Sequence, residues 1–245
     1  MSDSYRNTGY GYLYDVAIIR IILVILLVLY HAFAPFSGAW TPIEGYPDIR
    51  SYWWFDKFSY AFMLETFVFV SGYVYGYQVK TKGESRLEFK SLFLSKFKRL
   101  MIPSIIFSLL YILLLQDINQ PVVKTLYEVV CGVAHMWFLP MLFWCFIAVW
   151  LIEKSHVPSQ VAVLVIIAMS LLPIPSLPCQ IHHVFYYLPF FYVGYMLQRR
   201  DIALKSLYKP NVVVMLTIAF IALFPTLTLS KEWAEGLMGG VISVW

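Results

Sequence analysis

The sequence predicts an all-α fold, a polytopic bundle of about seven to eight transmembrane helices with the N-terminus in the cytoplasm. Hydrophobic residues make up 60% of the chain and charged residues 13%, about half of the ~25% charged share of a soluble domain. The mean hydropathy of the whole chain is +0.72, which is typical of an integral membrane protein. Long apolar runs recur along the chain, and Lys and Arg are spread unevenly over the connections between them.

Seven apolar runs approach the ~20 residues that a helix needs to cross a membrane. They cover about 16–34, 58–78, 100–115, 136–152, 161–174, 184–197 and 211–229. Prolines interrupt the fifth and sixth runs, among them Pro173 and Pro189. An eighth run begins near Leu237 and continues to Trp245. We expect residues 1–245 to form a single membrane domain.

The basic residues orient these spans. Two connections, 79–99 and 198–210, are rich in Lys and Arg. They contain Lys80, Lys82, Arg86, Lys90, Lys96, Lys98 and Arg99, and Arg199, Arg200, Lys205 and Lys209. The alternate connections 35–57, 116–135 and 175–183 contain few or none. Cytoplasmic loops carry the excess of Lys and Arg, so we expect the N-terminus and both basic connections inside.

Cysteine spacing and charge argue against other classes of protein. Cys131, Cys145 and Cys179 show no paired spacing, so we expect neither a disulfide framework nor a zinc site. His182 and His183 follow Cys179 without matching ligands elsewhere, and we expect no metal. The net charge of +4 fits membrane orientation rather than a basic soluble module, so we expect no nucleic-acid partner.

The first run carries two ionisable residues on one helix face. Arg20 and His31 are eleven residues apart, which is three turns plus ~20° of an α-helix and a rise of roughly 16 Å. Ionisable groups inside spans usually face a bundle interior or a cavity and mark function. The alternative is that Arg20 is an anchor whose head reaches the interface and that His31 is an interfacial polar residue.

Glu65 lies about seven residues into the second run from its outer end, roughly 10 Å deep. His31 is predicted at a comparable depth on the adjacent antiparallel span. A lone buried carboxylate is costly, so Glu65 should be neutral or paired. Pairing with His31 would hold one imidazole tautomer and raise its basicity. A protonated Glu65 bonded to a neighbouring backbone group is the alternative.

Small residues follow on the same run. Gly72 and Gly76 have a small-xxx-small spacing that permits close helix packing. Ser71 lacks the surrounding G-x-S-x-G pattern of a nucleophile, so we expect Ser71 and Gly72 to serve packing.

Several segments, in order along the chain, resemble the membrane acyltransferase 3 family of polytopic enzymes that O-acylate bacterial glycans. The most specific is an Arg, ten residues and a His on the first span, Arg20 to His31. The others are SGY at 71–73, KFKRLMIP at 96–103, HMWFLP at 135–140 and FYVGYML at 191–197. The family usually has R-x-x-R where this chain has Lys96 and Arg99, and about ten spans. We therefore expect the domain to be incomplete at its C-terminus.

The resemblance implies an O-acyltransferase of the bacterial inner membrane. It would move an acetyl group from cytoplasmic acetyl-CoA, its acyl-CoA co-substrate, to a sugar hydroxyl of a surface polysaccharide or lipid-linked glycan. The implied CoA-binding residues are Arg20, Lys96 and Arg99, and Arg suits phosphate through its planar fork. The positive-inside bias alone is the alternative explanation for these cations.

On the same resemblance, His31 is the candidate base or covalent acyl carrier. Glu65 as its partner is an inference from the predicted depth of the two residues and not from the resemblance. His135 and Trp137, at the outer end of the fourth run, would bind the acceptor, since aromatic faces stack on sugars. A place in the aromatic belt is the alternative for both.

The competing class of function is a transporter or flippase for a glycan or lipid-linked precursor. Arg20, His31 and Glu65 would then line a substrate or proton path. A proton-coupled transporter would favour several carboxylates at mid-membrane, and Glu65 alone is available. The one-face spacing of Arg20 and His31, with a basic cytoplasmic end, favours the acyltransferase.

Overall fold

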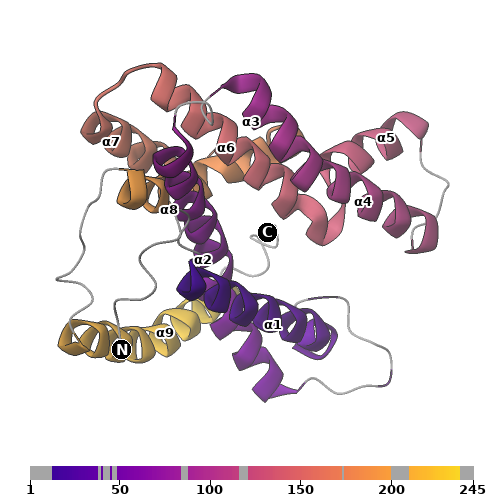
Figure 1. The fold of residues 1–245 in the computed structure, drawn as a ribbon. Coiled ribbons are helices and arrows are strands. Elements are labelled where there is room, and N and C mark those ends of the chain that lie inside the picture. The colour runs from indigo at the N-terminus through magenta and orange to yellow at the C-terminus, as the bar shows by residue number, and fades with distance from the viewer. Residues whose placement is uncertain are drawn as a thin grey trace. The chain divides into compact units, whose positions relative to one another are not determined.

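The computed structural model describes residues 13–37, 40, 45, 49–83, 88–115, 121–172, 174–199 and 210–237, with the side chains of 212, 213 and 227–237 left aside. Within these ranges the chain forms helices and no strand (Figure 1), which confirms the prediction of an all-helical protein. Arg86, Arg200, Lys205 and Lys209 of the basic connections, and the eighth run beyond Leu237, lie outside the described residues.

Each of the seven predicted runs lies in or overlaps a helix. The helices are α1 (Tyr14–Ser37), α2 (Arg50–Lys82), α4 (Ile102–Leu115), α6 (Phe138–Lys154), α7 (Ser159–Ser170), α8 (Ile181–Arg199) and α9 (Pro210–Leu237). Three stretches, Tyr14–Ser37, Phe89–Leu115 and Ala134–Lys154, are long and apolar enough to cross a membrane. Ser159–Ser170 and Val214–Thr226 are apolar but shorter. The larger total of seven to eight spans stays a prediction.

Two helices lie in connections where no helix was predicted. They are α3 (Phe89–Lys96) and α5 (Val122–Cys131). Helix α3 continues through a π-helical turn, η2 (Phe97–Met101), into α4. In η2 the N–H of Ile102 bonds to the carbonyl of Phe97, five residues back. Pro103 follows at once; its ring would clash with the carbonyl four residues earlier in a regular α-helix, and a widened turn relieves that clash.

The described chain divides into two compact units. Unit 1 comprises Met1–Ala17 and Glu65–Asp201, and unit 2 comprises Ile18–Leu64 and Ile202–Trp245. Helices α1 and α2 each contribute residues to both units. The prediction of a single membrane domain stays a prediction.

Unit 1 is built around a close seam between α2 and α8. A Cβ atom on Gly72 would overlap the carbonyl oxygen of Phe191, and one on Gly194 would overlap that of Phe69. The packing role predicted for Gly72 is therefore confirmed. Buried aromatic rings fill the space beside this seam: the centroids of Phe146 and Phe191 are 4.7 Å apart. Glycine thus lets two backbones meet where the neighbouring positions carry large rings.

Unit 2 is held together by aromatic contacts between α1, α2 and α9. The rings of Phe33 and Tyr52 stack with centroids 4.3 Å apart and nearly parallel planes. Phe58 of α2 meets Phe220 of α9 at 5.7 Å. Ring pairs of this kind contribute about 0.5–1.5 kcal/mol each beyond their buried area.

Candidate functional site

Arg20 and His31 lie on one uninterrupted helix, α1, as the sequence predicted. The Arg20 side chain is exposed, whereas His31 is half-buried. The His31 imidazole lies against two aromatic rings of unit 2, with centroid distances of 5.3 Å to Tyr30 and 5.2 Å to Trp40. An imidazole held among rings keeps a fixed orientation, which proton or acyl transfer requires.

Asp56 is a buried carboxyl in unit 2 that the sequence reasoning missed. Its side chain is 3% exposed and accepts a short hydrogen bond from the Ser37 hydroxyl. Burial raises the pKa of this carboxyl, while the Ser37 hydrogen bond and the charge of Lys57 act in the opposite direction. Asp56 also lies within electrostatic reach of Tyr30, the residue before His31. A lone acidic residue in the aromatic segment 52–62 was the available signal.

Glu65 belongs to unit 1, where α8 supplies its partner. The Tyr186 hydroxyl donates a hydrogen bond to Glu65 Oε1 over 3.3 Å. Among the described residues, Glu65 Oε2 is buried and has no hydrogen-bond partner. The sequence analysis did not name Tyr186. Because His31 is part of unit 2, its predicted pairing with Glu65 stays a prediction.

Lys96 and Arg99 are three residues apart but have different surroundings. The Lys96 ammonium lies 3.8 Å from the ring centroid of Phe146 and 5.5 Å from that of Tyr75, a cation–π arrangement. Lys98 and Arg99, in the η2 turn, are exposed. Of the two predicted CoA-binding residues in unit 1, Arg99 is therefore the more exposed.

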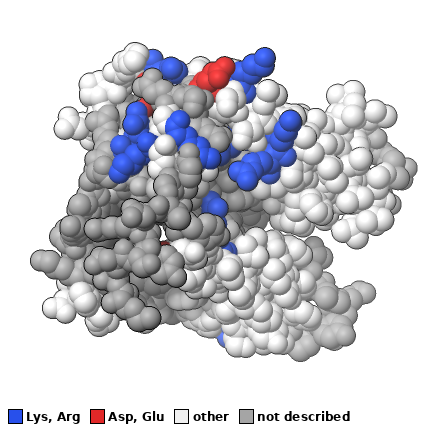
Figure 2. All heavy atoms as spheres, in the orientation of Figure 1, with Lys and Arg blue, Asp and Glu red and all other residues white. Residues whose placement is uncertain are grey.

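Exposed basic side chains gather in unit 1 around α3 and the C-terminal end of α2. Figure 2 shows Lys and Arg concentrated over the part that contains α3 and the end of α2. The exposed members are Lys80, Lys82, Lys90, Lys98, Arg99 and Lys154. Arg20, the third predicted CoA-binding residue, belongs to unit 2.

His135 and Trp137 lie in a short turn, η3 (Ala134–Trp137), that leads into α6. The exposed His135 meets the edge of Tyr111 with centroids 6.0 Å apart. Trp137 stacks instead on His183 of α8, at 4.4 Å. His183 is a residue that the sequence analysis weighed only as a metal ligand. Among the described residues, no group of three or more His, Cys, Asp or Glu side chains is placed to hold a metal ion.

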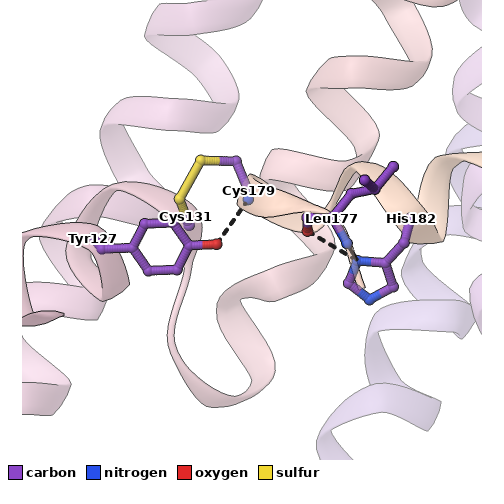
Figure 3. The surroundings of a disulfide bond; sticks show 5 residues. All are labelled: Tyr127, Cys131, Leu177, Cys179 and His182. Atoms are coloured by element: carbon purple, nitrogen blue, oxygen red, sulfur yellow. Dashed lines mark hydrogen bonds between the residues drawn. A yellow bond between two sulfur atoms is a disulfide. The ribbon is translucent and has the colours of Figure 1, made fainter. Parts of the chain in front are cut away.

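Cys131 and Cys179 form a disulfide (Figure 3), which corrects the inference from their spacing that the cysteines imply no disulfide framework. The bond joins the end of α5 to the short turn η4 (Pro178–Gln180), across 48 residues of sequence. A single pair so far apart has no spacing motif, because folding alone brings the two residues together. Cys145, in contrast, is buried and free.

Comparison with known proteins gives one match. The model of a family described as an acyltransferase domain, of the acyltransferase 3 type, matches residues 13–242. No curated protein matches the chain, and no solved structure does. The matched range contains every residue proposed for the site.

Proposed function

The chain belongs to the acyltransferase 3 family, and from this premise we propose that it is an O-acetyltransferase acting on a sugar. The donor would be acetyl-CoA, and the acceptor a hydroxyl of a surface polysaccharide or lipid-linked glycan. The observation that carries the proposal is Arg20 and His31 on one helix within the matched range. An acyl donor and an acceptor are implied by the family; the acetyl group and the sugar belong to the proposal.

The proposed location is the bacterial inner membrane, with the N-terminus and the basic connections in the cytoplasm. The apolar helices support a multi-pass protein. The disulfide supports the orientation independently of charge, because Cys131 and Cys179 both fall in connections predicted to be outside. Disulfides form and persist in oxidising compartments rather than in the cytoplasm.

On the cytoplasmic side, Arg20, Lys96 and Arg99 are proposed to bind the phosphates of CoA. The exposed position of Arg99 and the concentration of Lys and Arg near it support this role. The guanidinium can make two parallel hydrogen bonds to a phosphate. Lys96, whose ammonium lies over Phe146, would contribute its positive charge to the binding of the same phosphates.

His31 is proposed to act as the general base. Its neutral imidazole would take the proton of the acceptor hydroxyl while the oxygen attacks the thioester carbonyl carbon. The C–S bond then breaks, CoA leaves as a thiolate, and the imidazolium returns the proton to give the thiol. In the covalent alternative the imidazole itself carries the acyl group before the hydroxyl receives it.

Glu65 is proposed as the acid that fixes the tautomer of His31. A carboxylate bonded to an imidazole stabilises the imidazolium that forms during transfer. His135 and Trp137 are proposed to contact the acceptor sugar on the outer side.

Membranes that contain the chain can test this function directly. They would be incubated with acetyl-CoA labelled in the acetyl group, and surface polysaccharide and lipid-linked glycans would then be separated and counted. We expect label in the glycan as an ester that mild alkali releases. Translocation of unlabelled glycan without any ester would instead indicate a transporter.

A further inference from the structure

One corner of unit 1 is fixed by covalent and hydrogen bonds. We name the segments 127–137 and 177–187 the disulfide corner. Besides the Cys131–Cys179 bond, the Tyr127 hydroxyl accepts a hydrogen bond from the N–H of Cys179 over 3.2 Å (Figure 3). The His182 Nδ1 lies 3.3 Å from the N–H of Leu177 and 3.2 Å from its carbonyl oxygen. The disulfide and the Tyr127 hydrogen bond thus tie two segments that are distant in sequence, and the His182–Leu177 contacts lie within the second segment.

The backbone of this corner is unusual on both sides of the disulfide. Ala134, Cys179 and Gln180 have φ angles of 48°, 52° and 63°, in the left-handed region that non-glycine residues avoid. Such conformations persist where the surrounding structure holds them, and they cluster at functional sites. Ala134 directly precedes His135, and Gln180 lies two residues before His182, so these conformations help to set where the following side chains point.

Five side chains of the disulfide corner form a continuous group of rings. The centroids of His182 and His183 are 4.0 Å apart, those of His183 and Trp137 4.4 Å, and those of Trp137 and Tyr187 5.9 Å. Tyr187 is followed by Tyr186 at 4.8 Å. Tyr186 ends the group with its hydrogen bond to Glu65.

Rings and hydrogen-bonding groups in this combination suit a sugar. The C–H face of a pyranose packs against an aromatic ring, while its hydroxyls need donors and acceptors. Trp137 and His183 are half-buried and Tyr186 is exposed, so the group is neither fully packed away nor isolated. At one end of the group, Tyr186 bonds to Glu65, the carboxyl proposed as catalytic, so a sugar bound here would lie near that carboxyl.

We propose that the disulfide corner binds the pyranose ring of the acceptor through Trp137 and His183, and that Cys131 and Cys179 are positioning residues for this contact. The inference rests on the proposed function, in which the acceptor is a sugar. The Cys131–Cys179 bond holds η4 against the end of α5. Without that bond, η4 is no longer fixed to the end of α5, the relative placement of Trp137 and His183 depends on the packing of α6 against α8 alone, and the sugar is bound less tightly.

The experiment uses the full chain in membranes, with alkali-deacylated surface polysaccharide of the source cells as the acceptor. The Cys131→Ala/Cys179→Ala double variant, Trp137→Leu and His183→Ala would be compared with Cys145→Ala, which removes a buried free thiol. The measurements are the KM for polysaccharide, the kcat, and acetyl-CoA hydrolysis without acceptor. We expect the acceptor KM to rise at least about fivefold in the first three proteins. Cys145→Ala should leave the KM, the hydrolysis and the protein level unchanged, and the protein level should also stay unchanged in the other three.

Conservative and chemical controls sharpen the outcome. Trp137→Phe keeps an aromatic face and should restore part of the lost affinity. Dithiothreitol, which is oxidised to its cyclic disulfide as it reduces Cys131–Cys179 to two thiols, should raise the KM of the wild type, and reoxidation should lower it again. If the double variant fails to accumulate, Trp137→Leu and reduction of the wild type decide.

Three negative results are distinguishable. An unchanged acceptor KM in the Trp137, His183 and reduced proteins would overturn the inference while leaving the acyltransferase intact. Absence of any acetyl transfer or acetyl-CoA hydrolysis by the wild type would instead overturn the proposed function. A parallel loss of hydrolysis and acceptor affinity would also overturn the inference, because the disulfide would then support the whole fold.

Discussion

Helix α1 and the stretch Ala134–Lys154 both have the length and composition of membrane spans, but they are buried to different degrees. In the most apolar part of α1, 11% of residues are buried, compared with 39% in Ala134–Lys154. Many apolar side chains of α1, such as Ile21 and Val28, are exposed. In a bilayer this exposure costs little, because lipid tails are as apolar as the side chains.

The difference separates two ways of placing a functional residue. On α1, helix periodicity alone sets Arg20 and His31 on one face. In unit 1, the residues around α6 and α8 are placed by tight packing, by the α2–α8 seam and by the disulfide. A substitution on α1 should therefore change activity with little effect on folding, whereas one in the seam should change folding first.

The largest expected effect on folding is in the seam. Gly72→Leu would drive a side chain into the backbone of Phe191, and overpacking of this kind costs about 1–3 kcal/mol or more. We expect the amount of folded protein in membranes to fall severalfold, together with its thermal stability in detergent. Gly83→Asn is the matched control, since Gly83 has a φ of 73° and nothing within 4 Å of its would-be Cβ, and Asn tolerates that region. Normal accumulation of Gly72→Leu would show that the seam is not rigid.

The next effect should be on activity alone. His31→Ala should lower acetyl incorporation by about 10²-fold or more, as expected for loss of a general base, while protein level stays normal. His31→Gln keeps hydrogen bonding but cannot shuttle a proton at neutral pH, so it should be nearly as inactive. Val28→Ala, at an exposed apolar position of α1, is the control and should retain activity. Wild-type incorporation by His31→Gln would reduce His31 to an interfacial residue.

Features that repeat with helix periodicity could be predicted from the sequence. The helix that carries Arg20 and His31 was predicted because a continuous apolar run leaves one secondary structure available in a membrane. The close approach at Gly72 was also predicted, because the small-xxx-small spacing of Gly72 and Gly76 can be read from the sequence. The early start of the third helix was not, because the residues from Phe89 to Met101 are too basic to resemble a span.

Features that depend on distant contacts could not be predicted. Cys131 and Cys179 are 48 residues apart, and no local pattern reports that α5 and η4 meet. The same holds for the stacking of His183 on Trp137 and for the bond from Tyr186 to Glu65. Asp56 was missed because its burial involves Ser37, which lies 19 residues earlier in the sequence.

The smallest expected effect concerns the basic end of unit 1. Arg99 is exposed in the η2 turn, so Arg99→Gln should leave protein level unchanged and weaken acetyl-CoA binding by about five- to tenfold at low salt, the loss of one charged hydrogen bond. The loss should shrink as salt rises, because the screening length falls from about 8 Å at 0.15 M to about 3 Å at 1 M. Lys90→Gln removes one exposed charge from the preceding helix α3 and controls for general electrostatic attraction, with a smaller effect expected.

Binding of acetyl-CoA would be measured by calorimetry on purified protein in detergent across a salt series. Equal losses in the two variants would mean that the basic end acts as a diffuse field, as the positive-inside bias alone would produce. A loss confined to Arg99→Gln would mark a specific phosphate contact on the π-helical turn.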